Sequence, residues 1–292
     1  MRYRAGLSLA VCVLAGLLLG QPLPATAAAH VWSPPPGTSW QWQITGTVKT
    51  TYDVAMYDVD LQDAVPAART YSIAGFGSVT WPKGQNSGIV ARLHGQGKIA
   101  ICYLDSGAWE NYRPDAGLFP KSVIGNSSGW PGERWLDIRQ ASWPKFEPII
   151  LARLDLARDI GCDGVEPDEN NPIGNHPGFP ITLADEKAWY LEIAAQAHAR
   201  DLSVGMKNGV EVIDADTVAA FDWSLNEECY RYNECSTEDP FIAAGKAVFQ
   251  TEYMSTFNAA KFKRICTSSS KHGFSTIVKH LNLNAWVRFC PG

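Results

Sequence analysis

The sequence has little charge and lacks the motifs of several large protein classes. Only 19% of its residues are charged, whereas 46% are hydrophobic, which is enough to build a core and excludes intrinsic disorder for most of the chain. No Gly-x-Gly-x-x-Gly or Walker-type loop follows a strand-like segment, which counts against a nucleotide-binding fold. No Cys-x2-Cys or His-x3-His pair occurs, so we expect neither a metal ion nor another cofactor.

Long apolar runs and an excess of basic residues are also missing. After residue 19 no apolar run approaches the roughly 18 residues that a membrane-spanning helix needs. The formal net charge is −5, with 25 basic and 30 acidic residues, which disfavours a nucleic-acid-binding surface. We therefore expect no membrane and no nucleic acid among the partners, and we expect a monomer.

The first 29 residues have the pattern of a secretory signal peptide. Arg2 and Arg4 form a short basic start, residues 7–19 are apolar, and residues 25–27 form a cleavage site of small residues. We expect cleavage after Ala27 or Ala29 and a secreted, extracellular protein. Removal of this segment, which holds two arginines and no acidic residue, makes the remaining chain more acidic.

The cysteines suit an oxidising compartment. Of the seven, Cys12 lies in the predicted signal peptide and six remain, a number that leaves the pairing open. The candidate bridges are a local loop, a link between neighbouring strands and a tie for the C-terminal segment: Cys229–Cys235, Cys102–Cys162 and Cys266–Cys290. Six buried free thiols are the alternative.

Strand-like and helix-like segments alternate after a proline-rich leader at residues 30–39. The strand-like segments, rich in β-branched and apolar residues, are Tyr52–Asp58, Lys98–Leu104, Trp135–Ile138, Cys162–Glu166, Ser203–Lys207, Phe221–Asn226, Ala247–Glu252 and Phe274–Lys279, with Trp40–Ile44 and Thr70–Ala74 as further candidates. Alternation without a break in composition predicts a single α/β domain over residues 40–292. The length and the strand count fit a closed (β/α)8 TIM barrel better than an open doubly wound sheet.

Three helices are predicted between these strands. Pro148 begins one, and residues 258–271 form another. Thr182 caps the third, with Asp185 as its partner three residues later. The apolar-facing stripe of this third helix is expected at Ala188, Leu191, Ala195 and His198.

Polar and acidic residues gather where the predicted strands end. The candidate site residues at these ends are Tyr57, Asp58, Asp60, Tyr103, Asp105, Glu166, Asp168, Lys207, Asn208, Glu227 and Glu252. The carboxyl ends of barrel strands face one rim, where the active sites of such barrels are built. We therefore expect these side chains to converge on one pocket.

Carboxylates from different strands are the groups that glycoside hydrolysis requires. One protonates the leaving oxygen, and the other acts as nucleophile or as the base that activates water. Glu227 with either Asp168 or Glu166 is the expected pair. Lys207 either keeps a carboxylate ionised or pairs with Glu166 for structure. Aromatic rings suit sugar faces, and the candidates are Trp109, Trp130 and Tyr230.

Six segments together resemble a known family. They are residues 40–46 (WQWQITG), 101–107 (ICYLDSG), 130–139 (WPGERWLDIR), 161–168 (GCDGVEPD), 205–208 (GMKN) and 226–229 (NEEC). In this order they are similar to glycoside hydrolase family 114 over nearly the whole chain after the leader. The resemblance implies a TIM-barrel endo-α-1,4-polygalactosaminidase that cleaves galactosaminogalactan-type polymers. It places the family's catalytic Asp and Glu at Asp168 and Glu227.

Two positions leave questions open. Family members have Asp or Glu at position 166, so the choice between Glu166 and Asp168 stays open, and Glu169 stands where members often have Asn. Galactosamine units without acetyl groups are cationic, and an acidic chain attracts them. The alternatives are a non-catalytic polysaccharide-binding barrel, which the acids at 168 and 227 argue against, and a polysaccharide deacetylase, for which no His/Asp metal triad is evident.

Overall fold

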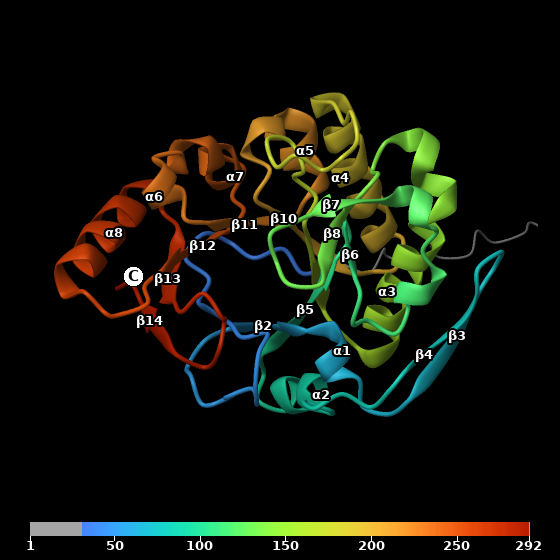
Figure 1. Ribbon diagram of the computed structural model, residues 1–292. Coiled ribbons are helices and arrows are strands. Elements are labelled where there is room, and N and C mark those ends of the chain that lie inside the picture. Colours follow the sequence, from blue (N-terminus) through green and yellow to red (C-terminus); the bar gives the residue numbers. More distant parts are fainter. Residues whose placement is uncertain (1–30, 292) are drawn as a thin grey trace, which may run out of the picture. The chain divides into compact units, whose positions relative to one another are not determined.

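The computed structural model describes residues 31–291, and its largest sheet is a nearly closed barrel (Figure 1). Eight strands run parallel in the order β1 (Trp40–Trp42), β2 (Met56–Asp60), β5 (Ile99–Asp105), β9 (Gly164–Asp168), β10 (Ser203–Lys207), β11 (Trp223–Glu227), β12 (Val248–Tyr253) and β13 (Ser275–Lys279). β14 (Val287–Phe289) continues the sheet antiparallel to β13. The Trp40 indole donates to the Ser275 carbonyl oxygen at 2.8 Å and so links β1 to β13. The predicted (β/α)8 barrel is confirmed.

The connections carry helices of very different length. The long ones are α3 (Glu147–Ile160), α4 (Leu183–His198) and α8 (Ala259–His272). The short ones are α1 (Leu61–Ala64), α2 (Ile89–His94), α5 (Ala215–Ala220), α6 (Cys229–Tyr232) and α7 (Asp239–Ala243). Pro148 lies in the first turn of α3, and the Thr182 hydroxyl accepts a hydrogen bond from the Asp185 amide. Both predicted helix starts are therefore confirmed.

The buried face of α4 differs from the predicted stripe. Its buried residues are Glu186, Trp189, Tyr190, Ile193, Ala194 and Ala197, whereas Ala195 is exposed. The predicted stripe is wrong because two adjacent large rings, Trp189 and Tyr190, decide which face removes most apolar surface from water. His198 is partly exposed, with its Nε2 atom 2.9 Å from Asp222 Oδ2.

One predicted barrel strand belongs to a different sheet. Residues 135–138 fall in and just after β8 (Glu133–Leu136), which pairs antiparallel with β6 (Ala108–Glu110) and β7 (Ile124–Ser127). We call these three strands the inserted sheet, since they lie between β5 and β9 in the chain. The eighth barrel strand is instead β1, from the further candidate at 40–44. The assignment failed because a short apolar segment is equally suited to either sheet.

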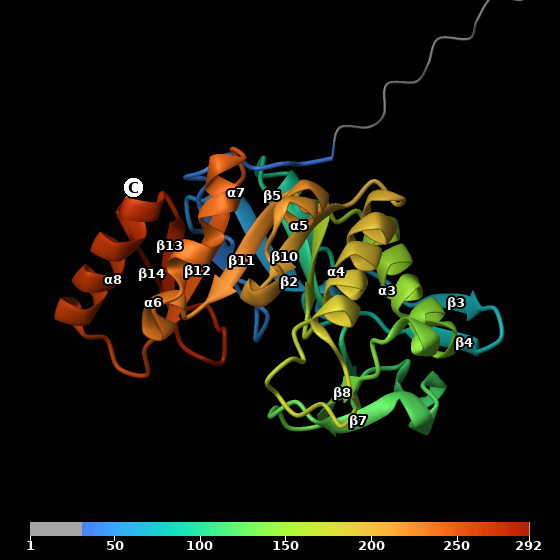
Figure 2. The same cartoon turned by 90° about the horizontal axis from the view of Figure 1, so that it is seen from above.

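A second addition is a hairpin of β3 (Arg69–Ile73) and β4 (Gly77–Trp81), which projects from the side of the barrel (Figure 1). The inserted sheet has a different position. Figure 2 shows β7 and β8 at the opposite end of the barrel from residues 31–39. This is the end toward which the parallel strands run, so the inserted sheet lies beside the expected site.

The barrel interior changes character along each strand. Its lower part is an apolar cluster that includes Trp40, Met56, Ile101, Trp223, Phe249 and Ile277. Side chains alternate across a strand, so inward positions recur every second residue. Two or four residues beyond the apolar cluster, the inward positions hold Asp58, Tyr103, Glu227, Tyr253 and Lys279. The strand order thus collects polar groups above a dry core.

Three disulfides join the six described cysteines in the candidate pairs. Cys102–Cys162, Cys229–Cys235 and Cys266–Cys290 have Cα–Cα distances of 6.0, 4.7 and 5.3 Å. The first of them links β5 to the turn before β9, two neighbouring strands of the barrel.

The N-terminal expectations fall partly outside the structure. Residues 1–29, the predicted signal peptide, lie outside the described residues. The described part of the leader rests against the barrel, where the Ala247 amide donates to the Pro34 carbonyl oxygen at 2.9 Å. Within residues 31–291, no helix has the length and apolar character that crossing a membrane requires.

Candidate active site

Lys207 lies at the centre of the polar end of the barrel. It ends β10, its side chain has no exposed surface, and its ammonium lies 2.6 Å from Glu166 Oε1, 2.8 Å from Asp168 Oδ2 and 3.5 Å from Glu227 Oε2. The ammonium also lies 4.5 Å from the ring centroid of Trp42. Burial opposes the charged form, but the carboxylates of Asp168, Glu166 and Glu227 outweigh it and hold the pKa of Lys207 well above its ordinary value.

The three carboxylates around Lys207 differ in their access to solvent. The side chains of Asp168 and Glu227 are 13% and 25% exposed, whereas that of Glu166 is fully buried. Glu166 and Asp168 lie two residues apart on β9, so both point inward and Glu166 lies deeper. Two carboxylates from β9 and β11 therefore reach solvent, and a third lies below them.

Glu227 is held in place by groups from the two adjacent strands. The Asn208 amide donates from Nδ2 to Glu227 Oε2 at 3.1 Å, and the Glu227 backbone amide donates to Asn208 Oδ1 at 2.9 Å. The Tyr253 hydroxyl, at the end of β12, donates to Glu227 Oε1. Asn208 adopts a left-handed φ of 51°, a conformation that Asn tolerates better than most residues. This backbone turn brings its amide against Glu227.

Asp58 and Glu166 form a buried acid pair beneath the site. Neither carboxylate oxygen of Asp58, nor Glu166 Oε2, has another hydrogen-bond partner among the described residues. Burial raises the pKa of Asp58 to about 7, while its contact with Glu166 and the charge of Lys207 lower it. Burial likewise raises the pKa of Glu166, against the lowering effect of Lys207. Lys207 donates to Glu166 Oε1 but to neither oxygen of Asp58, so one ammonium offsets the repulsion between the two buried acids.

The two exposed carboxylates line a cavity of about 440 Å³. Its wall also includes Trp42, Asp60, Tyr103, Tyr112, Arg113, Trp130, Glu133, Glu169 and Tyr253. A second hollow of about 480 Å³ shares Tyr253, Leu281 and Asn282 with the first. The two hollows therefore lie next to each other on the rim.

The structure brings part of the predicted set into this cavity. Asp60, Tyr103, Trp130, Asp168 and Glu227 line it, and Lys207 and Asn208 contact its carboxylates. Asp58, Asp105 and Glu166 point inward but are fully buried. Asp60 Oδ2 is 2.8 Å from Arg113 Nη2, so this wall carboxylate is paired.

Four predicted residues lie away from the cavity. Trp109 packs against a core cluster, and its indole donates to the Ala116 carbonyl oxygen at 3.0 Å. Tyr57 packs in the core between strand and helices, where its hydroxyl donates to the Tyr52 carbonyl oxygen at 3.2 Å. Glu252 is buried on the outer face of β12 and accepts from the Tyr230 amide at 2.8 Å. Tyr230 itself packs against the core. Tyr57 and Glu252 each lie one residue out of phase with the inward positions, so their strands direct them outward.

Several cavity residues escaped the sequence analysis. Tyr253 follows the predicted end of its strand by one residue, and its inward phase was the available signal. Trp42 lay in a strand candidate that was not placed in the barrel. Tyr112 and Glu133 come from the inserted sheet and the loop beside it, and no pattern in the sequence places that sheet at the rim.

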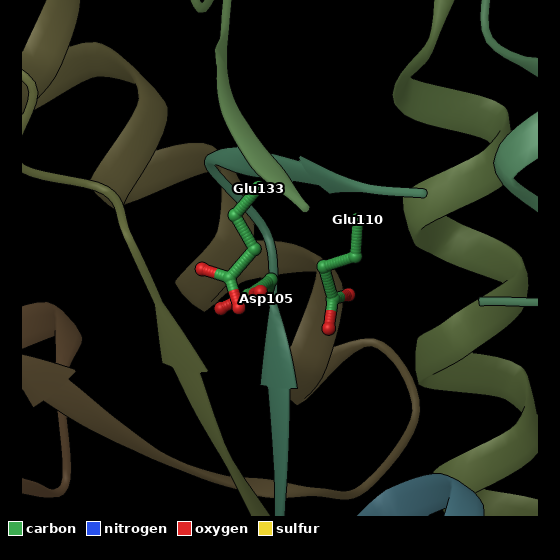
Figure 3. A group of neighbouring side chains, drawn as sticks. All are labelled: Asp105, Glu110 and Glu133. Atoms are coloured by element: carbon green, nitrogen blue, oxygen red, sulfur yellow. The ribbon is translucent and has the colours of Figure 1, made fainter. Parts of the chain in front are cut away.

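Three further carboxylates meet behind the wall of the cavity. Oxygens of Asp105, Glu110 and Glu133 lie within 4.8 Å of one another, and Figure 3 shows the carboxylates of Asp105 and Glu133 side by side with Glu110 next to them. Glu110 is paired with Arg113 and, at 2.9 Å, with Arg153. Two guanidinium groups thus already supply positive charge to one member, which makes the cluster a poor metal site.

Comparisons with known proteins agree with this geometry. The chain matches the model of glycoside-hydrolase family GH114 over residues 21–292. It is similar to the crystal structure of Aspergillus fumigatus Ega3 in complex with galactosamine, with 35% identity, a TM-score of 0.77, and coverage of 91% of this chain and 99% of that one. The glycoside hydrolase domain of PelA from Pseudomonas aeruginosa shares the fold, with 12% identity, a TM-score of 0.63, and coverage of 87% and 98%.

A curated relative gives a partial match. An uncharacterised protein of Deinococcus radiodurans is 32% identical over 195 residues, which are 59% of this chain and 60% of that protein. The match therefore spans less than two thirds of that relative. The family match covers nearly the whole chain and includes every strand of the barrel. The chain belongs to glycoside-hydrolase family GH114 and is a glycoside hydrolase.

Proposed function

We propose that this protein is a secreted endo-acting hydrolase that cleaves α-1,4-linked galactosamine polymers, with Asp168 and Glu227 as its catalytic pair. The observation that carries the proposal is that both carboxylates contact one buried lysine and also line the cavity. One of them protonates the leaving glycosidic oxygen, and the other acts as nucleophile or as the base for water.

Lys207 and Glu166 lie deeper in the barrel than the catalytic pair and fix the charge and the position of its carboxylates. Lys207 supplies the positive charge that keeps the carboxylates around it from repelling one another. Glu166 holds this ammonium from the buried side, at 2.6 Å, and does not reach the cavity. Glu166 is therefore assigned to positioning Lys207, and Asp168 is the better partner for Glu227.

The nature of the substrate is proposed from the shape and charge of the cavity. The two neighbouring hollows, of about 440 and 480 Å³, give room on the rim for more than one sugar unit, which favours cleavage inside a polymer. The wall carries the carboxylates of Asp60, Glu133 and Glu169, which attract cationic sugars. Similarity to a protein whose crystal structure contains galactosamine agrees with this choice.

The proposed location rests on the disulfides. Three bridges within residues 31–291 persist in an oxidising environment such as the outside of the cell. The signal-peptide pattern at residues 1–29 gives the route by which the chain reaches it.

The test is incubation of the purified protein with de-N-acetylated α-1,4-galactosamine polymer, followed by sizing of the products. An endo-acting enzyme produces a ladder of short oligomers from the start of the reaction. Release of acetate from an acetylated polymer without shortening would indicate a deacetylase. Binding without any products would indicate a non-catalytic polysaccharide-binding barrel.

A further inference from the structure

The wall of the cavity that the inserted sheet forms presents exposed aromatic rings. Trp130 is 46% exposed and Tyr112 is 55% exposed. The guanidinium of Arg113 lies over the Tyr112 ring at 5.5 Å, whereas among residues 31–291 no aromatic ring and no cation is stacked on Trp130. A large apolar ring left open beside a cavity is a suitable surface for the apolar face of a sugar.

Glu133 and Glu169 line the same cavity as Trp130, and both lack a cationic partner within the described part of the chain. Glu133, at the start of β8, accepts hydrogen bonds from the Tyr112 hydroxyl at 2.6 Å and the Ser128 hydroxyl at 3.4 Å. The Glu169 side chain lines the cavity and accepts from no described donor. Among the other wall carboxylates, Asp60 is paired with Arg113 and Asp168 with Lys207, whereas Asp63 accepts from the Gln85 side-chain amide.

A buried carboxylate, that of Asp105, lies close to Glu133 and adds to the negative charge there. Asp105 is fully buried, and its Oδ2 has no hydrogen-bond partner among residues 31–291. Figure 3 shows its carboxylate next to that of Glu133, with Glu110 to one side of them. Glu110 is the member of the group that is paired with Arg113 and Arg153. Burial and the neighbouring acids raise the pKa of both Glu133 and Glu169. A cation on the cavity side of Glu133 relieves this repulsion.

We propose that Glu133 and Glu169 bind the ammonium group of one galactosamine unit while its ring lies against Trp130. This inference rests on the proposed function and adds to it a position at which the enzyme distinguishes a free amine from an N-acetyl group. An ammonium donates to the carboxylates and neutralises them. An acetamide at the same place is larger and uncharged, and it leaves both carboxylates without a counter-charge.

The variants that test the proposal are Glu133→Gln and Glu169→Asn. Glu169 has a left-handed φ of 59°, which Asn adopts more readily than Glu, so this variant keeps the turn. Asp201→Asn is the matched control, since Asp201 is exposed, has a φ of 58°, and lies before β10 at the far end of the barrel. It removes the same charge in the same backbone conformation.

Kinetics on fully de-N-acetylated polymer give the first readout. We expect each test variant to raise KM by roughly ten-fold or more, the usual loss for a hydrogen bond to a charged group, with a smaller change in kcat. The Asp201→Asn control keeps the wild-type KM. Unchanged KM in both test variants, with the wild type active, overturns this inference and leaves the proposed function intact. An inactive wild type instead overturns the proposed function.

Partially N-acetylated polymer gives the second readout. Mass-spectrometric sequencing of the products locates acetyl groups relative to the new chain ends. The wild type is expected to exclude acetyl groups from one fixed position, and the two test variants to admit them there. Equal acetyl content at every position in the wild-type products overturns the inference.

Calcium gives the third readout, because the three clustered carboxylates could instead hold a divalent cation. Thermal unfolding is measured with CaCl2 and with a chelator. A calcium-dependent rise in the Tm of the wild type, absent from Glu133→Gln, assigns the cluster to a metal and overturns the ammonium site. An unchanged Tm in wild type and variant supports it.

Discussion

The two ends of the barrel interior are made by the same strands with opposite chemistry. On β11, Trp223 lies in the dry lower cluster, and four residues later Glu227 lines the cavity. On β12, Phe249 and Tyr253 are related in the same way. The lower end removes apolar surface from water and stabilises the fold. The upper end gathers buried lysines and several carboxylates, which costs stability and provides the reacting groups.

Replacing Phe249 with Ala tests the lower end. The ring is fully buried and packs against Trp40 and Trp223 with centroid distances of 5.0 and 5.4 Å. We expect a loss of about 3–5 kcal/mol in the free energy of unfolding, from lost burial and the cavity left behind. Urea unfolding measures it. The kcat of the folded fraction should stay close to wild type, and a large fall in kcat would contradict the separation of the two ends.

Asp168→Asn and Glu227→Gln test the upper end. Each amide keeps the size of the side chain but cannot donate a proton, attack, or activate water. We expect activity on the galactosamine polymer to fall on the order of 10²-fold or more, with the Tm within a few degrees of wild type. Glu166→Gln is the comparison variant, because Glu166 contacts Lys207 but not the cavity. A greater loss of activity in Glu166→Gln than in Asp168→Asn would exchange their roles.

The variant Asp58→Asn tests how much the ionisation of a buried carboxyl group at the upper end lowers the free energy of unfolding. A folded-state pKa of about 7 for Asp58 lies above the value of about 4 for an unfolded chain. Its contribution to stability is therefore present at low pH and is lost as the pH rises through about 7. Asn stays neutral, so between about pH 5 and pH 8 the wild type should lose about 2–3 kcal/mol relative to the variant. Urea unfolding at both pH values measures this, and a difference independent of pH would contradict it.

Salt should weaken the attraction between the polymer and the exposed carboxylates of the cavity wall, and it should leave the catalytic step unchanged. Raising the ionic strength should increase KM for the de-N-acetylated polymer a few-fold, because exposed attractions are screened beyond roughly 8 Å at physiological salt. The kcat should change little, since the carboxylates act at contact distance. With a fully N-acetylated polymer the salt effect on binding should disappear, because that chain carries no charge. A KM that ignores salt would remove the long-range attraction but not the catalytic pair.

Features that depend on a few neighbouring residues could be predicted from the sequence. Features that depend on which residues of a strand point into the barrel were predicted less well. The pair Thr182 and Asp185 is a local signal that predicts where a helix begins. Cys229 and Cys235 are only six residues apart, so their disulfide could also be predicted locally. The inward phase was correct on β9, where Glu166 and Asp168 share a face. It was missed at Tyr57 and Glu252, because a charge at a strand end does not reveal the phase that the core imposes.

The inserted sheet could not be placed from the sequence for a different reason. Residues 135–138 have the composition of a barrel strand, and only pairing with β6 and β7 over a distance in the chain puts them elsewhere. Glu133 and Trp130 reach the cavity as a result of that pairing. The catalytic candidates needed only the end of a barrel strand, so they were accessible to sequence analysis.

The Cys102–Cys162 disulfide has a consequence for how this enzyme tolerates damage and change. It joins two residues that are 60 apart in the chain and encloses the inserted sheet and α3 in a covalent loop. A protease cut anywhere in that loop, for instance at the exposed turn near Gly129, leaves both fragments attached to the barrel. The bridge therefore keeps the wall of the cavity that the inserted sheet forms tethered to β5 and to the start of β9 after such a cut.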